Sequence, residues 1–157
     1  MTNLANPISL NPTQPGRAVE VLLIEDNPGD VRLTQEAFKE GRVLVNLTVA
    51  QDGVEALEIL NRRGPHHDKV RPDLILLDLN LPKKNGREVL LEIKADDDLK
   101  RIPVIVMTTS KAEQDIHRAY NLNANCYITK PVELDEFLNV VRSIEDFWLT
   151  IVTLPRG

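Results

Sequence analysis

Residues 73–86, DLILLDLNLPKKNG, decide the fold because they end a short apolar strand with a carboxylate. The run Leu74–Leu77 is apolar throughout, as expected for a parallel strand that is buried on both faces of a sheet. Asp78 follows this run directly, and the next helix is expected from Gly86 to about Lys94. Seven residues separate Asp78 from that helix, so Asp78 comes too early to be its N-cap residue.

Three other apolar runs are followed by polar groups in the same way. VEVLLI is followed by Glu25-Asp26, VIVM by Thr108, and CYIT by Lys130. Ligands of an open parallel sheet bind beyond the carboxyl ends of its strands, so these groups are expected to converge with Asp78. Carboxylates, a hydroxyl and an ammonium group together suit a divalent cation and a transferable phosphoryl group.

Strands and helices alternate along the chain from Val19 onward. The second helix is expected to begin at Asp52-Gly53, to present Val54, Leu57 and Leu60 on one apolar stripe, and to end at Gly64-Pro65. Five βα units of this length predict an α/β fold, a doubly wound five-stranded parallel sheet with helices on both faces. Strands are expected at Val19–Ile24, Val43–Ala50, Leu74–Leu77, Val104–Met107 and Cys126–Thr129. The other helices are expected at Asp30 to Glu40, Gly86 to Lys94, Ala112 to Leu122 and Val132 to Trp148.

The 157 residues predict one domain with two short flanking segments. Residues 1–18 are expected to be a flexible leader, 19–149 the domain and 150–157 a C-terminal tail. The net charge of -5 argues against direct binding of nucleic acid or of an anionic membrane. No apolar run is long enough to span a bilayer, and the N-terminus does not resemble a signal peptide. A single cysteine, Cys126, fits a reducing compartment, so a cytoplasmic location is expected.

Each motif also has a simpler explanation. Glu25-Asp26 could form an acidic turn in which Asp26 caps the following helix. Thr108 could cap the next helix, although Ser110 is the better candidate for that cap, and Thr108 is then the first residue beyond its strand. Lys130 could be a solvated residue at the start of the last helix. The combination of all four motifs favours a functional site over these separate roles.

The motifs LLIEDNPGD, DLILLDLNLPKKNG, PVIVMTTS and NCYITKP together resemble the receiver domain of the response-regulator family. The resemblance covers residues 19 to about 148 and implies a flavodoxin-like strand order, 2-1-3-4-5. It implies that Asp78 accepts a phosphoryl group from a sensor histidine kinase. It also implies the remaining roles: Glu25, Asp26, Asp78 and the Asn80 backbone carbonyl for Mg²⁺ or Mn²⁺, Thr108 and Lys130 for the phosphoryl group, and Thr108 with Tyr127 for the conformational switch.

Three further segments resemble the response regulators that pair with bacterial and cyanobacterial phytochromes. They are GPHHDKVRP (64–72), AYNLNANCYITKPVELDEF (119–137) and FWLTIVTLP (147–155). This narrower resemblance implies a phytochrome-type photoreceptor kinase as the partner.

The leading functional hypothesis is a single-domain phosphoacceptor switch that signals through protein contacts and is no enzyme beyond its own phosphorylation and dephosphorylation. One alternative is a Mg²⁺-dependent phosphatase or phosphotransferase with an aspartyl nucleophile. Such enzymes typically place that nucleophile after the first strand with a second Asp two residues on, whereas position 80 here is Asn. A second alternative is a binding module that acts without phosphorylation.

The last helix predicts a self-association surface. Its apolar residues cover roughly twice the stripe of about 100° that a core-facing helix needs. Leu134, Leu138 and Val141 are assigned to the sheet. The residues assigned to a symmetric homodimer interface are Phe137, Val140, Ile144, Phe147, Trp148 and Ile151. The alternative is that the tail folds back over this surface within one chain.

Overall fold

The computed structural model describes residues 18–62, 68, 70–108 and 126–129, together with 134, 135, 138, 139, 141–143, 145 and 146. Its centre is a five-stranded sheet with the order β2-β1-β3-β4-β5, and every neighbouring pair is parallel. The strands are β1 (Val19–Ile24), β2 (Val45–Ala50), β3 (Leu74–Asp78), β4 (Val104–Thr108) and β5 (Cys126–Thr129). The predicted fold class and strand order are therefore confirmed.

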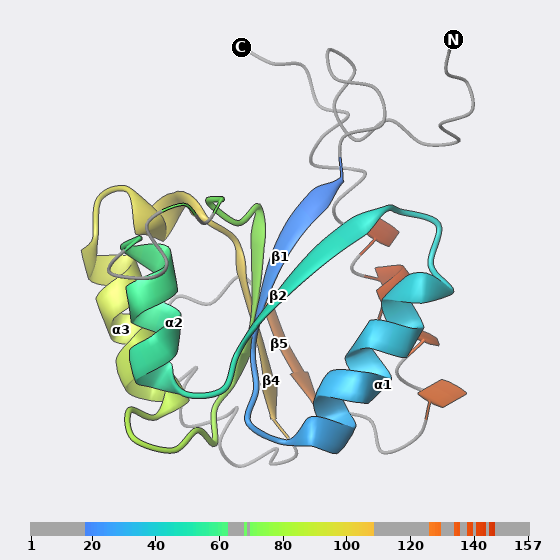
Figure 1. Ribbon diagram of the computed structural model, residues 1–157, viewed down its shortest axis with the longest axis horizontal. Coiled ribbons are helices and arrows are strands. Elements are labelled where there is room, and N and C mark those ends of the chain that lie inside the picture. Colours follow the sequence, from blue (N-terminus) through green and yellow to red (C-terminus); the bar gives the residue numbers. More distant parts are fainter. Residues whose placement is uncertain are drawn as a thin grey trace, which may run out of the picture.

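The register of the sheet aligns the carboxyl ends of its strands. Ile24 of β1 pairs with Ala50 of β2 on one side and with Leu77 of β3 on the other. Asp78 pairs with Met107 of β4. Residues that follow the ends of β1, β3 and β4 must therefore meet at one edge of the sheet, which lies at the bottom of Figure 1.

Helices cover both faces of the sheet. Figure 1 shows α1 (Pro28–Lys39) on one face and α2 (Gly53–Leu60) with α3 (Gly86–Ala95) on the other. A short 3₁₀ helix, η3 (Leu99–Arg101), follows α3. Each of these three α-helices begins with a side-chain cap, in which Asn27, Asp52 or Asn85 accepts a hydrogen bond from a backbone N–H of the first turn.

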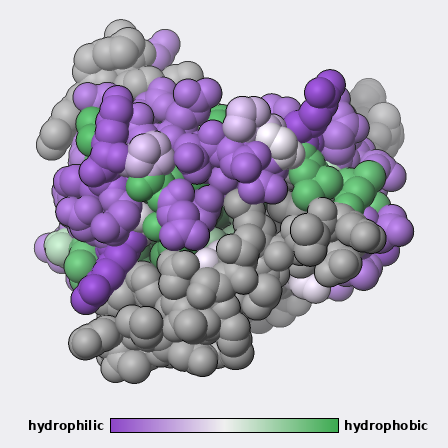
Figure 2. All heavy atoms as spheres, turned by 90° about the horizontal axis from the view of Figure 1, so that it is seen from below, coloured by the Kyte–Doolittle hydropathy of each residue, from purple (hydrophilic) through white to green (hydrophobic). Residues whose placement is uncertain are grey.

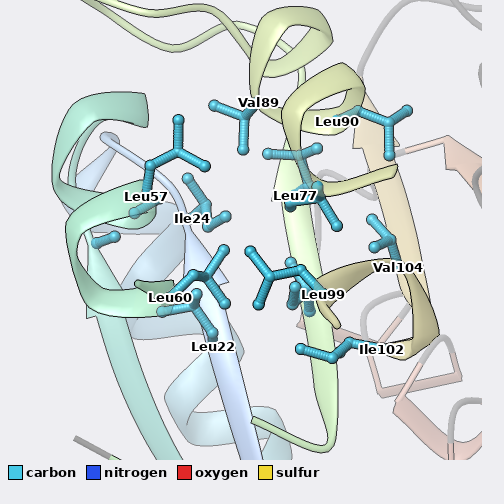
Figure 3. Close-up of a cluster of buried hydrophobic side chains, with 14 of the residues drawn as sticks. Leu22, Ile24, Leu57, Leu60, Leu77, Val89, Leu90, Leu99, Ile102 and Val104 are labelled. Atoms are coloured by element: carbon cyan, nitrogen blue, oxygen red, sulfur yellow. The ribbon is translucent and has the colours of Figure 1, made fainter. Parts of the chain in front are cut away.

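The two faces of the sheet carry two separate cores. Along β1, Leu22 and Ile24 join the cluster under α2 and α3, whereas Val21 and Leu23 join the cluster under α1. Figure 3 shows the first cluster, in which side chains of β1, β3, α2 and α3 point toward one another. Alternation along an apolar strand thus fills both cores, as a doubly wound sheet requires.

Several predicted boundaries differ from the structure. The helix α1 begins at Pro28 rather than Asp30, because Asn27 is its cap and proline is well tolerated in a first helical turn. The strand β2 begins at Val45 rather than Val43, since the Val43 N–H donates to the Glu145 carboxylate instead of to a neighbouring strand. The helix α2 ends at Leu60, with Asn61 as its C-cap residue, before the predicted stop at Gly64-Pro65.

The predicted apolar stripe of α2 was partly wrong. Val54 is 42% exposed, whereas Leu57 and Leu60 are buried as predicted. Ala56 and Ile59 complete the buried face instead of Val54. Near the other end of the chain, Val141 is buried and Leu138 packs against the core under α1, but Leu134 is 37% exposed.

Some predictions fall on residues that the structure does not describe. These are the helix expected at 112–122, residues 1–17 of the leader, and the tail at 150–157. Within the described part of the chain, no helix has the length and apolar character to cross a membrane.

Candidate metal and phosphoryl site

Three carboxylates meet at the carboxyl edge of the sheet. Glu25 and Asp26 follow β1 directly, and Asp78 is the last residue of the neighbouring strand β3. One ligand oxygen from each of the three lies within 4.8 Å of the other two. The sheet register therefore brings together the three acidic residues that the sequence predicted as a site, although 52 positions separate Asp26 from Asp78.

The three acidic residues differ in exposure. Glu25 and Asp78 are buried, at 1% and 5% relative exposure, while Asp26 is exposed. Backbone N–H groups orient the two buried carboxylates. Asn27 N–H donates to Glu25 Oε2 at 3.3 Å, and Asn80 N–H donates to Asp78 Oδ1 at 3.0 Å. The cluster thus has fixed inner members and an outer member that faces solvent.

The carboxylates line a depression at this edge. The residues around it are Glu25, Asp26, Asn27, Pro28, Asp30, Asp78 and Asn80. Figure 2 views the molecule from this side, where the described surface is mainly hydrophilic. Asn27 and Asp30 were not predicted as lining residues. The available signal was the position of Asp30 in the first turn after the Glu25-Asp26 motif, where Asn27 Oδ1 accepts its N–H at 3.1 Å.

The alternative role of Asp26 as a helix cap is excluded, because Asn27 caps α1.

A second hollow adjoins the depression and shares Glu25, Asp26 and Pro28 with it. It extends along α1 and the end of β2, where it is lined also by Val31, Arg32, Gln35, Val49 and Gln51. The acidic depression is therefore open on the side of α1.

Thr108 lies at the same edge as the carboxylates. It is the last residue of β4, not the first residue beyond the strand as predicted, and it is fully buried. It follows Met107, which pairs with Asp78, and it pairs with Thr129 of β5. The backbone of Tyr127 lies opposite Val106.

The remaining predicted site residues are outside the described part of the chain. Lys130 follows β5 directly but is not described, and neither is the side chain of Tyr127. The same holds for all six residues of the predicted dimer interface: Phe137, Val140, Ile144, Phe147, Trp148 and Ile151.

The loop after β3 carries Asn80 to the depression. Leu79 and Leu81 are buried on either side of the exposed Asn80, so the loop alternates between the core and the site. The Gly86 N–H donates to the Leu79 carbonyl at 3.1 Å and closes the loop. A Cβ at Gly86 would lie 2.6 Å from Leu79 Cα, so this position requires glycine.

The donor set fits a hard divalent cation. Mg²⁺ takes oxygen ligands and is typically held by one or two carboxylates with waters and phosphate oxygens. Three carboxylates and Asn80 line one depression here. A cation among them would also offset the mutual repulsion of three like charges.

The family model of the response regulator receiver domain matches residues 21–142 of the chain. The response regulator Rcp1 of Synechocystis sp. is 50% identical over 137 residues, which cover 87% of this chain and 93% of Rcp1.

Two solved structures are similar in both sequence and fold. The phosphorylated cyanobacterial phytochrome response regulator RcpA is 50% identical, with a TM-score of 0.80 over 89% of this chain and 100% of RcpA. The Mn²⁺-bound form of Rcp1 is 49% identical, with a TM-score of 0.77 over 88% of this chain and 99% of Rcp1.

Proposed function

This chain belongs to the response regulator receiver domain family, and on that premise we propose that Asp78 is its phosphoacceptor. Phosphorylation on an aspartate is typical of the family. The observation that carries the assignment is the position of Asp78 at the end of the central strand β3, within 4.8 Å of Glu25 and Asp26. Its Oδ1 accepts the Asn80 N–H at 3.0 Å, so the loop after β3 helps to orient the carboxylate.

Receiver domains bind Mg²⁺, and the acidic cluster of this chain fits that ion or Mn²⁺. We assign its ligands to Glu25, Asp26, Asp78 and the Asn80 backbone carbonyl. When bound, the cation offsets the negative charge of the carboxylates and of the phosphoryl oxygens. The role of Glu25 and Asp26 is then to hold the cation beside Asp78.

The transfer exchanges one bond to phosphorus for another. A carboxylate oxygen of Asp78 attacks the phosphorus of a phosphohistidine on the kinase, and an aspartyl phosphate forms as the P–N bond breaks. The electron pair of that bond stays on the leaving imidazole. Attack of water on the aspartyl phosphate later releases inorganic phosphate and restores the Asp78 carboxylate.

Thr108 and Lys130 are the proposed contacts of the bound phosphoryl group. A buried hydroxyl at the end of β4 supports this role for Thr108, because it is next to the residue that pairs with Asp78. Lys130 follows β5, the neighbour of β4. A shift of Thr108 toward the phosphate, accompanied by Tyr127, would convert phosphorylation into a conformational change.

The proposed partner is a sensor histidine kinase of the phytochrome type. Response regulators of phytochrome systems partner with such kinases, and RcpA is one of these regulators. The hollow along α1 opens beside the acidic depression and supports approach of another protein from that side. The output is proposed to be protein contact, without catalysis of another substrate and without direct binding of nucleic acid.

Self-association is proposed through the last helix and the tail. Burial of Val141 and packing of Leu138 against the core support the assignment of that side of the helix to the sheet, and the proposal gives the other apolar residues of the helix to the dimer interface. Sedimentation of the wild-type protein should give a homodimer, and Phe147→Glu with truncation after Leu149 should give a folded monomer. A wild-type protein that sediments as a monomer at high micromolar concentration, whether phosphorylated or not, would rule out the homodimer.

Intact mass measurement after incubation with Mg²⁺ and acetyl phosphate tests the phosphoacceptor. The wild-type protein should gain one acid-labile phosphate, and Asp78→Asn should gain none. Asp73→Asn is the matched control, since Asp73 immediately precedes β3 at the opposite end and there accepts the Glu20 N–H. Phosphate uptake by Asp78→Asn equal to that of the control would assign the phosphate to another residue.

A further inference from the structure

Two residues of the loop between β3 and α3, residues 79–85, pack into the hydrophobic core. The loop places Asn80 at the acidic depression. Leu79 and Leu81 are 4% and 8% exposed and belong to the same cluster as Leu57 of α2 and Val89 of α3. The path of the loop therefore depends on the packing of Leu79 and Leu81 in the core that α2 and α3 cover.

The first turn of α2 lies against this loop. A Cβ at Gly53 would overlap the Lys84 carbonyl oxygen and would lie 2.9 Å from Lys84 Cβ and 2.7 Å from Val89 Cγ2. Ordinary contacts of a Cβ are 3.4–4 Å. Only glycine allows the backbone of the loop to approach α2 this closely.

A second contact joins the loop to α2 beside Gly53. Lys83 has a left-handed backbone, with φ of 65°, and its Nζ lies 3.5 Å from Asp52 Oδ2. Residues with a Cβ disfavour this conformation, which persists where surrounding contacts hold it. The other oxygen of Asp52 accepts the Glu55 N–H at 2.8 Å and caps α2. One carboxylate thus links the start of the helix to the loop.

We propose that Asp52 and Gly53 are positioning residues that hold the loop so that Asn80 stays at the three carboxylates. Through Lys83 and Lys84 they set the affinity for the divalent cation. The inference rests on the proposed function, in which the Asn80 backbone carbonyl is a metal ligand. Neither residue lines the acidic depression itself.

Gly53→Ala is the first test, with Mg²⁺ affinity measured by titration calorimetry. The added methyl group must displace Lys84, so Mg²⁺ should bind about tenfold more weakly, the lower end of the cost of losing a contact that orients a metal ligand. At saturating Mg²⁺, the rate of phosphorylation by acetyl phosphate should return to within about twofold of wild type, because the backbone of Asp78 belongs to β3 and not to the loop.

Gly41→Ala is the matched control. A Cβ at Gly41 would overlap the Glu145 carboxylate at the opposite edge of the sheet, although there it meets the end of a side chain and not a backbone atom. It should lower stability without changing Mg²⁺ affinity. Gly53→Ala with the affinity of this control, or with a rate that stays low at saturating Mg²⁺, would overturn the inference.

Lys83→Gln is an independent test that does not require a clash. Removal of a positive charge near the site would by itself strengthen Mg²⁺ binding. If the contact between Lys83 and Asp52 positions the loop, its loss should outweigh this charge effect, and Mg²⁺ should bind about twofold more weakly, a change within the range of an exposed ion pair. Equal or tighter binding would overturn the inference. Failure of the wild-type protein to bind Mg²⁺ or to take up phosphate would refute the proposed function itself. That result is distinguishable from the results for Gly53→Ala and Lys83→Gln that would overturn only this inference.

Discussion

The three carboxylates of the site are chemically alike but differ in what their removal would do to the protein. Glu25 and Asp78 are buried and accept backbone hydrogen bonds, so their replacement disturbs local structure as well as charge. Asp26 is exposed, and the cap of the following helix α1 is Asn27 instead. Asp26 is therefore the residue whose substitution reports most directly on the cation.

Asp26→Ala should weaken Mg²⁺ binding by at least about tenfold, or ~1.4 kcal/mol, because it removes a carboxylate from a site with few ligands. Its thermal stability without metal should stay close to that of wild type. Titration calorimetry measures the first quantity and thermal unfolding the second.

Glu36→Ala is the control, since it removes the same charge from an exposed position on α1 that is ion-paired with Lys39. Screening by solvent makes that change small for Mg²⁺ binding. If Asp26→Ala and Glu36→Ala had equal affinities, the cation would have to bind elsewhere.

At the scale of elements, the strands were the most predictable part of the fold. β1, β3 and β4 are short apolar runs that are buried almost throughout, so their composition identified them. β2 was identified instead from the alternation of apolar and other residues along it. The polar residues after these runs were predictable as a site for the same reason, because parallel strands end at one edge. The structure brings Glu25, Asp26 and Asp78 together as predicted.

Local patterns did not determine which residues cap and which residues face inward. Asp26 and Asn27 are both good cap residues, and only the structure assigns the cap to Asn27. Val54 fits the spacing of an apolar stripe, but Ala56 and Ile59 cover the core instead. Short helices admit more than one inward face, and the choice depends on which neighbours they pack against.

Contacts between distant segments were beyond a local pattern altogether. Asp52-Gly53 was identified as a helix start, which is correct, but its approach to Lys84 depends on the position of another loop. Likewise, nothing near Val43 in the sequence indicates that a residue 102 positions later accepts its N–H. Such contacts arise only when the sheet is assembled.

At the scale of the whole molecule, a buried carboxylate links two distant segments of the chain at the edge of the sheet opposite the acidic site. Glu145 is 2% exposed, and its Oε2 accepts the Val43 N–H at 3.1 Å. Arg42 Nε lies 3.7 Å from Glu145 Oε1, and Arg42 also bonds Asp146. This bond, together with the charge of Asp146, raises the pKa of the Arg42 guanidinium. The helical residues 145 and 146 are thereby tied to the turn between α1 and β2.

Glu145→Ala should destabilise the protein by about 2–3 kcal/mol, because it leaves the buried Val43 N–H without its acceptor and Arg42 without one of its partners. Glu145→Gln keeps an oxygen for Val43 and should cost less than half as much. Urea unfolding measures both, and hydrogen exchange of the Val43 amide should accelerate only in the alanine variant.

Asp146→Ala is the matched control, since Asp146 is largely exposed and its loss should change stability by no more than about 0.5 kcal/mol. Mg²⁺ affinity should be unchanged in all three variants, because the acidic site and the cluster of Arg42, Glu145 and Asp146 occupy opposite edges of the sheet. A Glu145→Ala protein as stable as wild type would show that Val43 gains its hydrogen bond from water at no cost. An altered Mg²⁺ affinity would show instead that the two edges are coupled through the sheet.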